Sequence, residues 1–123
     1  MEDKSLNRAK GIEGENEAEV FLRTKGLKII EKNWCMGKLE IDLIGTVGKH
    51  IVFIEVKKRY SKAYREPWEA VNRKKQRNII LAANIYLKKS NTDLEPRFDI
   101  VSIIQDGQKI EIEHIEQAFW PMA

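Results

Sequence analysis

The sequence predicts a single α/β domain in which helices flank a mixed β-sheet, and two observations lead to this prediction. Stretches with apolar residues at helical spacing alternate with stretches rich in β-branched residues, in the order α-β-β-β-α-β-β. The stretch 51–57 is apolar on both of its alternating faces, which is typical of a central strand covered on both sides. A helix placed between strands of this kind favours layers of helices packed around the sheet.

The length and composition of the chain agree with one globular domain. Its 123 residues are 42% hydrophobic and 33% charged, which suits one core and a polar surface. We expect the core to span about residues 7–115, with short tails at both ends. No stretch has the roughly 18 apolar residues of a membrane helix, and residues 1–10 do not resemble a secretory signal. We therefore expect a cytoplasmic protein with no membrane partner.

The first half of the chain is predicted as one helix followed by three strands. Apolar residues recur at helical spacing over residues 7–25, and Gly26 is typical of the end of a helix. The three β-type stretches of this half are 27–33, 39–45 and 51–57. Gly48 with Lys49 marks a turn before the third, so the strands are expected to form an antiparallel meander.

The second half is predicted as a loop, a helix and two strands. The polar and basic stretch 59–67 is expected as a loop, and 68–89 as a helix whose apolar residues follow a 3.6-residue period. Two further strands are expected over 98–104 and 109–114. Asp106-Gly107 between them is a hairpin signal.

Charged residues interrupt the most apolar of these strands. Glu55 and Lys57 fall on the same strand face as Ile51 and Phe53, because side chains alternate along a strand. A buried charge is costly unless it is paired or binds a metal. Glu55 and Lys57 therefore either line a cleft or form a buried ion pair.

The preceding strand carries carboxylates as well. Aspartate is a poor strand former, yet Asp42 stands within an apolar run and shares a face with Glu40. If the two strands pair through a hairpin, Asp42 falls opposite Ile54 or Glu55. Two carboxylates that converge would repel each other without a cation between them, and oxygen-rich sites of this kind suit Mg²⁺ or Mn²⁺.

One charged residue on each predicted helix joins this pattern. Glu15 lies on the same helical stripe as Ala18 and Leu22, and Lys75 lies between Val71 and Ile79 on another apolar stripe. Taken alone, a glutamate of this kind is more often solvated, and a lysine more often extends out of an apolar face. It is the conjunction of these charged positions that indicates a site.

Basic residues gather from Lys58, after the third strand, to Arg77 in the second helix, although the net charge of the chain is only +3. Eight basic residues in this region oppose two acidic ones; they are Lys58, Arg59, Lys62, Arg65, Arg73, Lys74, Lys75 and Arg77. Such segregation predicts a basic surface for the phosphates of a nucleic acid. The aromatic residues Tyr60, Tyr64 and Trp68 are candidates for stacking on unpaired bases, or they pack in the ordinary way.

These residues resemble the PD-(D/E)XK nuclease superfamily, in which a strand aspartate precedes a Glu-X-Lys strand. More closely, the chain resembles the YraN family of uncharacterised endonuclease-like proteins. The matching segments include Gly14-Glu15, Glu40-Ile41-Asp42-Leu43-Ile44, Glu55-Val56-Lys57, Lys75-Gln76 and Arg97-Phe98-Asp99-Ile100-Val101. The core is also similar to that of the archaeal Holliday-junction resolvases. The resemblance implies a restriction-endonuclease-like sandwich.

The resemblance also implies a Mg²⁺- or Mn²⁺-dependent endonuclease acting on DNA, including branched or structured DNA. Asp42, Glu55 and Glu15 would bind the metal, and Lys57 would position the attacking water. Lys75 would assist the active site or touch phosphate, with Gln76 as the other candidate for that place. The role of Glu40 is open, since it would either replace or supplement Glu15.

Two further matters stay open on the sequence. The resolvases act as dimers, so a homodimer is one expectation, and Phe119 with Trp120 would then either supply the contact or fold back onto the core. The rival interpretations of function are a non-catalytic nucleic-acid-binding module that retains the nuclease fold, and an interaction protein in which Asp42, Glu55 and Lys57 form a buried ionic network.

Overall fold

The computed structural model describes residues 4–60 and 71–121. Two helices and five strands occur in this part of the chain, in the order that the sequence predicts. They are α1 (Lys4–Thr24), β1 (Lys28–Met36), β2 (Leu39–Val47), β3 (His50–Tyr60), α2 (Arg73–Ser90), β4 (Glu95–Asp106) and β5 (Lys109–Phe119). Neither of these helices is long and apolar enough to cross a membrane.

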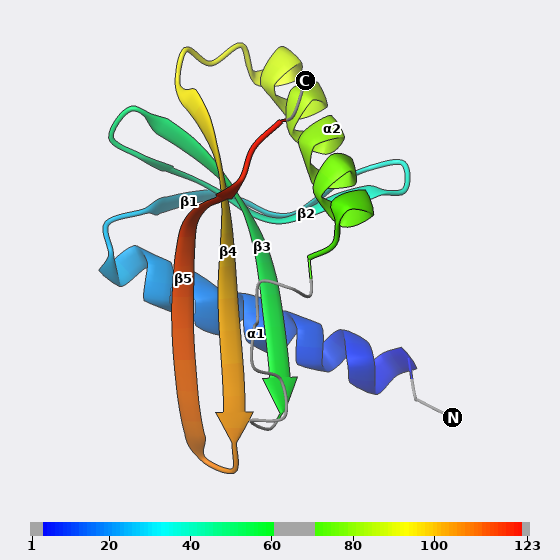
Figure 1. Cartoon of the computed structure of the whole chain (residues 1–123), viewed down its shortest axis with the longest axis vertical. Coiled ribbons are helices and arrows are strands. Elements are labelled where there is room, and N and C mark those ends of the chain that lie inside the picture. The colour runs from blue at the N-terminus through cyan, green and yellow to red at the C-terminus, as the bar shows by residue number, and fades with distance from the viewer. Residues whose placement is uncertain (1–3, 61–70, 122–123) are drawn as a thin grey trace.

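The strands form one mixed sheet in the order β1-β2-β3-β4-β5 (Figure 1). Neighbouring strands are antiparallel except β3 and β4, which are parallel. Parallel neighbours need a crossover connection, and α2 lies in the connection between β3 and β4. The first three strands are the antiparallel meander expected from the sequence.

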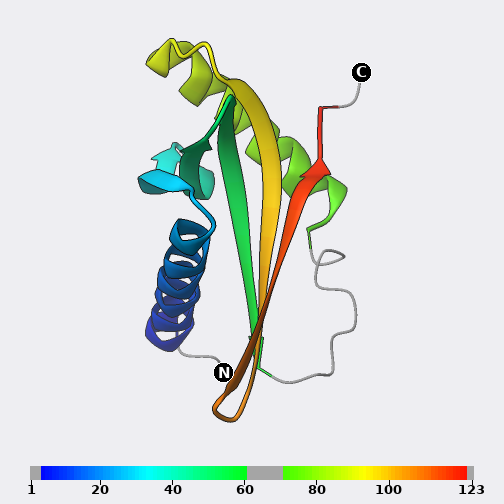
Figure 2. The ribbon, with the colours of Figure 1, turned by 90° about the vertical axis from the view of Figure 1, so that its left-hand side faces the viewer.

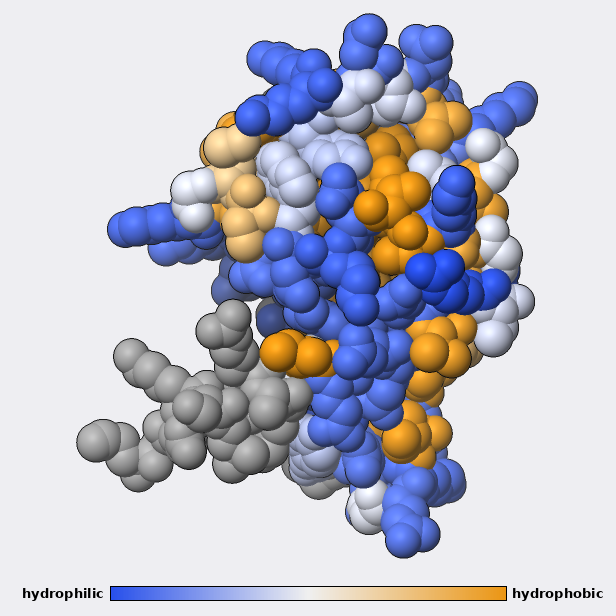
Figure 3. Space-filling model, turned by 180° about the vertical axis from the view of Figure 1, so that it is seen from behind, coloured by the Kyte–Doolittle hydropathy of each residue, from blue (hydrophilic) through white to orange (hydrophobic). Residues whose placement is uncertain are grey.

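The sheet is covered on both faces, as the apolar strand 51–57 predicts (Figure 2). Along β3, Phe53 packs into a core shared with α2, and Ile54 packs into a second core shared with α1. The residues of α2 in the first core are Ile79, Ala82, Ala83 and Tyr86, and those of α1 in the second are Ala18 and Leu22. The architecture is therefore an α/β sandwich of the restriction-endonuclease-like type. Seen from the side of α1, its surface is mainly hydrophilic (Figure 3).

Two predicted boundaries around the connection between β3 and α2 are wrong. β3 continues through Arg59 and Tyr60, which were expected in a loop, because this strand stays paired with β4 as far as the Tyr60–Gln105 pair. The helix expected from residue 68 begins only at Arg73, because the side chain of Asn72 accepts a hydrogen bond from the Lys75 amide and caps it. Residues 68–70 lie outside the described part of the chain.

The C-terminal strand is longer than predicted and returns to the core. β5 extends to Phe119, whose ring stacks on Phe98 with 5.3 Å between the ring centroids. Phe119 is buried, whereas the next residue, Trp120, leaves 57% of its surface exposed. Of the two alternatives for this aromatic pair, folding back onto the core therefore holds for Phe119 alone.

The sheet divides at the middle of β2. The β2–β3 ladder ends at the Leu43–Ile54 pair. Beyond it, β2 continues to Leu39 paired with β1, and β3 continues to Tyr60 paired with β4. The β1–β2 hairpin thus diverges from the rest of the sheet (Figure 1). We call the gap between the separating parts of β2 and β3 the fork.

A buried aspartate ties β4 to β5. Asp99 is fully buried and accepts hydrogen bonds from Arg97 at 3.0 and 2.8 Å, from the Gln117 amide at 3.0 Å and from His114 Nε2 at 2.7 Å. Burial alone would raise the pKa of Asp99, but the hydrogen bonds from His114, Arg97 and Gln117 outweigh it and leave that pKa below its usual value. This network stabilises the distorted pairing between Phe98 and Ile100 on β4 and the end of β5.

We expect Asp99→Asn to lower the free energy of unfolding by about 1–3 kcal/mol, because a neutral amide leaves the buried hydrogen-bond donors incompletely satisfied. Urea unfolding at pH 7 measures this change. The matched control is Asp93→Asn at an exposed position, which should stay within about 0.5 kcal/mol of the wild type. Equal stability of the two variants would contradict the structural role of Asp99.

Candidate functional site

Five of the charged residues singled out in the sequence line one pocket at the fork, although they come from three elements. The pocket has a volume of about 440 Å³. Glu15 of α1, Glu40 and Asp42 of β2, and Glu55 and Lys57 of β3 all lie in its wall. The divergence of β2 from β3 opens space that a continuous ladder would fill with backbone hydrogen bonds.

Asp42 stands at the point where the two strands separate. Its Oδ2 atom accepts a hydrogen bond of 2.8 Å from the amide of Val56, two residues beyond Ile54 of the last ladder pair. Burial raises the pKa of Asp42, this hydrogen bond lowers it, and the charge of Glu40 raises it again; the net effect is upward. Asp42 is therefore fixed in direction by β3 and held where a negative charge is unfavourable.

Glu55 is the most buried acid of the pocket, with 5% of its side chain exposed. The Nζ atoms of Lys57 and Lys75 lie 3.9 and 3.7 Å from its Oε1 atom. Burial, followed by the charge of Asp42, nevertheless raises the pKa of Glu55 to about 7. Two partly exposed lysines at these distances do not offset the cost of a second buried carboxylate.

Glu15 reaches the pocket because α1 lies close to β3. The residue before it is Gly14, where a Cβ atom would stand 3.1 Å from the Cβ of Lys58, so a larger side chain would press the helix away. Burial raises the pKa of Glu15, a hydrogen bond with the Asn33 side chain lowers it, and the charges of Asp42 and Glu40 raise it, with an upward net effect.

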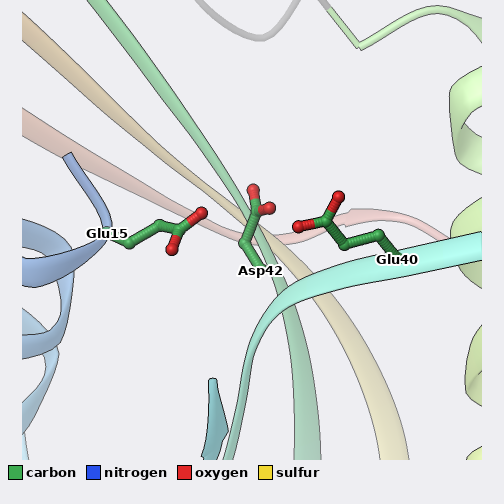
Figure 4. Close-up of side chains that lie close together, drawn as sticks. All are labelled: Glu15, Glu40 and Asp42. Carbon is green, nitrogen blue, oxygen red and sulfur yellow. The ribbon is translucent and has the colours of Figure 1, made fainter. Parts of the chain in front are cut away.

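Three carboxylates form the tightest group of the site. Each of Glu15, Glu40 and Asp42 offers an oxygen atom, and these atoms lie within 4.8 Å of one another. Figure 4 shows Asp42 between the other two, with Glu15 reaching in from α1 and Glu40 from further along β2. Glu15 and Glu40 thus both lie beside Asp42, an arrangement in which Glu40 would supplement Glu15. Glu55 does not belong to this group of three but lines the same pocket.

The chemistry of these donors fits a hard divalent cation. Mg²⁺ and Mn²⁺ prefer carboxylate oxygens and retain several water ligands. Burial and mutual repulsion raise the pKa of Glu15, Asp42 and Glu55, so negative charge is in excess here. A divalent cation would remove that excess, and the carboxylates of Glu15, Glu40 and Asp42 would hold it, with Glu55 beside them.

The structure distinguishes Lys75 from its neighbour Gln76 on α2. Lys75 extends toward β3 and its ammonium group contacts Glu55. The Gln76 side chain instead donates a hydrogen bond of 2.9 Å to the Val71 carbonyl, just before the helix. Of these two candidates for assisting the site, it is therefore Lys75 that reaches it.

The predicted basic residues do not all lie on one exposed surface. Arg73, Lys74 and Arg77 are exposed on α2. Only 4% of the Lys58 side chain is exposed, because its Nζ atom forms ion pairs with Glu13 and Glu17 of α1. Lys58 thus fastens α1 to β3 and takes no part in the interface proposed below. Arg59 is partly buried on β3. Lys62 and Arg65 lie outside the described residues, as do Tyr64 and Trp68.

Two residues of the site were not assigned to it from the sequence. Asn33 lies within β1 with a φ of 52°, and its side chain forms a hydrogen bond with Glu15. Asparagine tolerates this left-handed backbone region better than most residues do, so an asparagine at the end of the predicted strand 27–33 was an available signal. Tyr60 lines the pocket, and its hydroxyl group donates a hydrogen bond of 3.2 Å to Glu13. Its inclusion in a predicted loop concealed that role.

The comparison with protein families identifies the chain. A model of the uncharacterised protein family UPF0102 matches residues 14–103. The chain belongs to the UPF0102 family. This is the YraN family, so the resemblance noted in the sequence is confirmed at that level. The matched range contains Glu15, Glu40, Asp42, Glu55 and Lys57.

Relatives of similar length carry the same family name. A UPF0102 protein of Phocaeicola vulgatus is 41% identical over 90% of this chain and 92% of its own length. A UPF0102 protein of Hahella chejuensis is 48% identical over 74% of each chain. One of Lawsonia intracellularis is 38% identical over 89% of this chain and 83% of its own length. Their names assign no activity, so the function of this UPF0102 protein must be inferred from the site.

Proposed function

We propose that this UPF0102 protein is a Mg²⁺- or Mn²⁺-dependent endonuclease that hydrolyses phosphodiester bonds in DNA. One observation supports this function above all. Carboxylates from α1, β2 and β3 line the same pocket as the ammonium group of Lys57. Hydrolysis of a phosphodiester needs a site that binds a cation, orients a water molecule and neutralises charge on the phosphate.

The carboxylates and Lys57 have different roles in the proposed hydrolysis. A bound divalent ion supplies Lewis acidity and lowers the pKa of a coordinated water. Asp42, oriented by the Val56 amide, and its neighbours Glu15 and Glu40 would hold the cation. Lys57 lies on the same strand face as Glu55, where its ammonium group can orient water and stabilise charge that develops on the phosphate.

The helix α2 suits a polyanionic substrate. Four of its first five residues are basic and none is acidic; Lys75 is directed to the site, and Arg73, Lys74 and Arg77 are exposed at the start of the helix. Contacts from such residues to phosphates position a nucleic acid without reading its sequence. Within the nucleic acids we propose DNA, including branched or structured DNA, because the sequence resembles the Holliday-junction resolvases.

A nuclease assay with a variant of Lys57 tests this function. Purified protein is incubated with Mg²⁺, Mn²⁺ or EDTA and with linear, flapped, four-way and single-stranded substrates. The wild type should cut at least one DNA substrate with a metal ion and none in EDTA. Lys57→Ala should cut about 100-fold more slowly, the loss expected for a residue that assists proton transfer or stabilises developing charge.

Lys88→Ala is the matched control, since Lys88 is exposed at the far end of α2. It should cut at the wild-type rate. Equal cutting by wild type and Lys57→Ala would identify a contaminating nuclease and remove the proposal.

A non-catalytic nucleic-acid-binding module is the second candidate, and the basic surface of α2 favours it independently of the acidic pocket. It predicts binding that weakens steeply as salt rises, because phosphate contacts release counterions. Salt-dependent binding without metal-dependent cutting of any substrate would select this second function over the first.

A further inference from the structure

A second pocket lies on the other side of α2 from the acidic site. Its volume is about 390 Å³, and it is formed between α2 and the C-terminal segment that follows β5. Its wall includes the side chains of Arg73, Arg77, Ile80, Leu81, Asn84 and Trp120. Most residues of α2 in this wall face away from the sheet, on which Ile79, Ala82, Ala83 and Tyr86 pack, whereas Ile80 lies at the edge of that core.

The fold holds an aromatic ring at this pocket and leaves it exposed. Phe119 is buried and stacks on Phe98, which anchors the end of β5. Trp120, the next residue, leaves 57% of its surface exposed, and Leu81 on α2 leaves 52% exposed. Large apolar groups that remain this accessible in a lined pocket are suited to a flat apolar ligand.

The pocket is also positively charged at a place where the helix itself disfavours cations. Arg73 and Arg77 lie one turn apart in the first two turns of α2, where the helix dipole is positive and no acidic residue is present. Among the described residues, no carboxylate forms an ion pair with either arginine. Guanidinium groups of this kind match phosphate oxygens in geometry and charge. A ligand with both a flat ring and a phosphate would satisfy both halves of the pocket.

We propose that this pocket binds an unpaired nucleotide of a nucleic-acid strand. The indole of Trp120 stacks on the base, and Arg73 and Arg77 hold the adjoining phosphates. The Asn84 side chain offers an amide to the edge of the base. Stacking on an aromatic ring beside a basic groove is how proteins bind single strands without sequence preference.

The position of α2 connects this pocket to the acidic site, and here the inference rests on the proposed function. Lys75 lies between Arg73 and Arg77 in the sequence, but its ammonium group is on the opposite side of the helix, 3.7 Å from Glu55. The start of α2 therefore separates the two pockets. A strand whose scissile phosphate lies in the acidic pocket would cross the start of α2 to reach Trp120. The substrate class that fits both pockets is DNA with a single-stranded segment beside the cleavage point.

Binding measured without metal tests the pocket separately from catalysis. Fluorescence anisotropy in EDTA compares a labelled duplex that carries a single-stranded overhang with a blunt duplex of the same length. The wild type should bind the overhang substrate more tightly. Trp120→Ala should weaken overhang binding about 5- to 150-fold, the equivalent of losing one stacked base, and leave blunt-duplex binding within about twofold. Trp120→Phe should retain most of the affinity.

Matched controls separate stacking and charge from general effects. Ile110→Ala removes an exposed apolar side chain on β5 and should change neither affinity. Arg77→Ala should reduce the slope of log affinity against log salt concentration, measured for overhang binding, by about the value of one phosphate contact. Lys89→Ala removes the same charge at the far end of α2 and should not change this slope.

Two results would overturn the inference. The first is that Trp120→Ala affects both substrates equally or neither. The second is that free dAMP competes as well as the overhang strand does, which would make the pocket a site for mononucleotides. If the protein cuts DNA but does not prefer substrates with an overhang, the role of this pocket is contradicted and the nuclease proposal is not. If it prefers to bind the overhang but cuts no substrate, the nuclease proposal is contradicted and the role of the pocket is not.

Discussion

Replacing Asp42 by Asn is expected to lower metal-dependent phosphodiester hydrolysis by at least about 1000-fold, equivalent to about 4 kcal/mol of activation free energy. Asp42 lies between Glu15 and Glu40 in the group of three carboxylates. Its negative charge is therefore close to a cation wherever in the group the cation binds. The fold should persist, because the amide oxygen of asparagine can still accept the hydrogen bond from the Val56 amide. Cleavage rates in saturating Mn²⁺ measure the loss of activity.

Calorimetric titration with Mn²⁺ tests the same variant without a substrate. The wild type should bind the ion, and Asp42→Asn should bind it far more weakly. Asp93→Asn makes the same chemical change at an exposed position between α2 and β4, and should bind and cut as the wild type does. Wild-type cleavage by Asp42→Asn would place the chemistry outside the fork.

Replacing Glu55 by Gln is expected to stabilise the metal-free protein at pH 8 by up to about 3 kcal/mol. The pKa of Glu55 is about 7 in the folded chain, against 4.5 for an ordinary glutamate. Between pH 4.5 and pH 7 the folded state binds more protons than the unfolded state does. The free energy of unfolding therefore falls as the pH rises through this range. A difference of one in the pKa between the folded and unfolded chain corresponds to about 1.4 kcal/mol in the free energy of unfolding. Glutamine carries no charge and avoids this loss.

Urea unfolding in EDTA measures the change at pH 8 and again at pH 5, where the advantage of Glu55→Gln should shrink to about 1 kcal/mol. Glu113→Gln, at an exposed position on β5, should alter stability little at either pH. Adding Mn²⁺ at pH 8 should stabilise the wild type more than Glu55→Gln, because a ligand that binds only the folded state raises its stability.

The same variant separates the metal site from a buried ionic network. In such a network the carboxylate of Glu55 would be needed by Lys57 and Lys75, and its removal would destabilise the fold by about 3–5 kcal/mol. A stability loss of that size for Glu55→Gln in EDTA would favour the network.

The alternation of side chains along one strand predicted much of the candidate site. It placed Glu55 and Lys57 on the face of Phe53, and the structure has Glu55 buried there at the wall of a pocket. It also predicted Asp42 opposite Ile54 or Glu55, and the ladder ends one pair before that position. The divergence of β2 was not predictable, because alternation gives the face of a strand but not the direction in which the strand leaves its neighbour.

The grouping of basic residues along the chain was less reliable than strand alternation. Lys58 follows Lys57 in the sequence, but successive residues of a strand point to opposite faces. Lys58 therefore faces α1, where Glu13 and Glu17 lie one helical turn apart and pair with it. Had the alternation of side chains been extended to Lys58, this residue would not have been assigned to the basic surface. The start of α2 was likewise readable, since Asn72 is a favourable N-cap residue.

The fork has a mechanical consequence. Glu40 and Asp42 are carried by the hairpin of β1 and β2, whereas Glu55 and Lys57 are carried by the part of the sheet that contains β4 and β5. The two parts are joined through the short ladder between Leu43 and Ile54 at one end and Val47 and His50 at the other. The twist of that ladder therefore sets the distance between the site residues of β2 and those of β3, and with it the space that a cation between them would have.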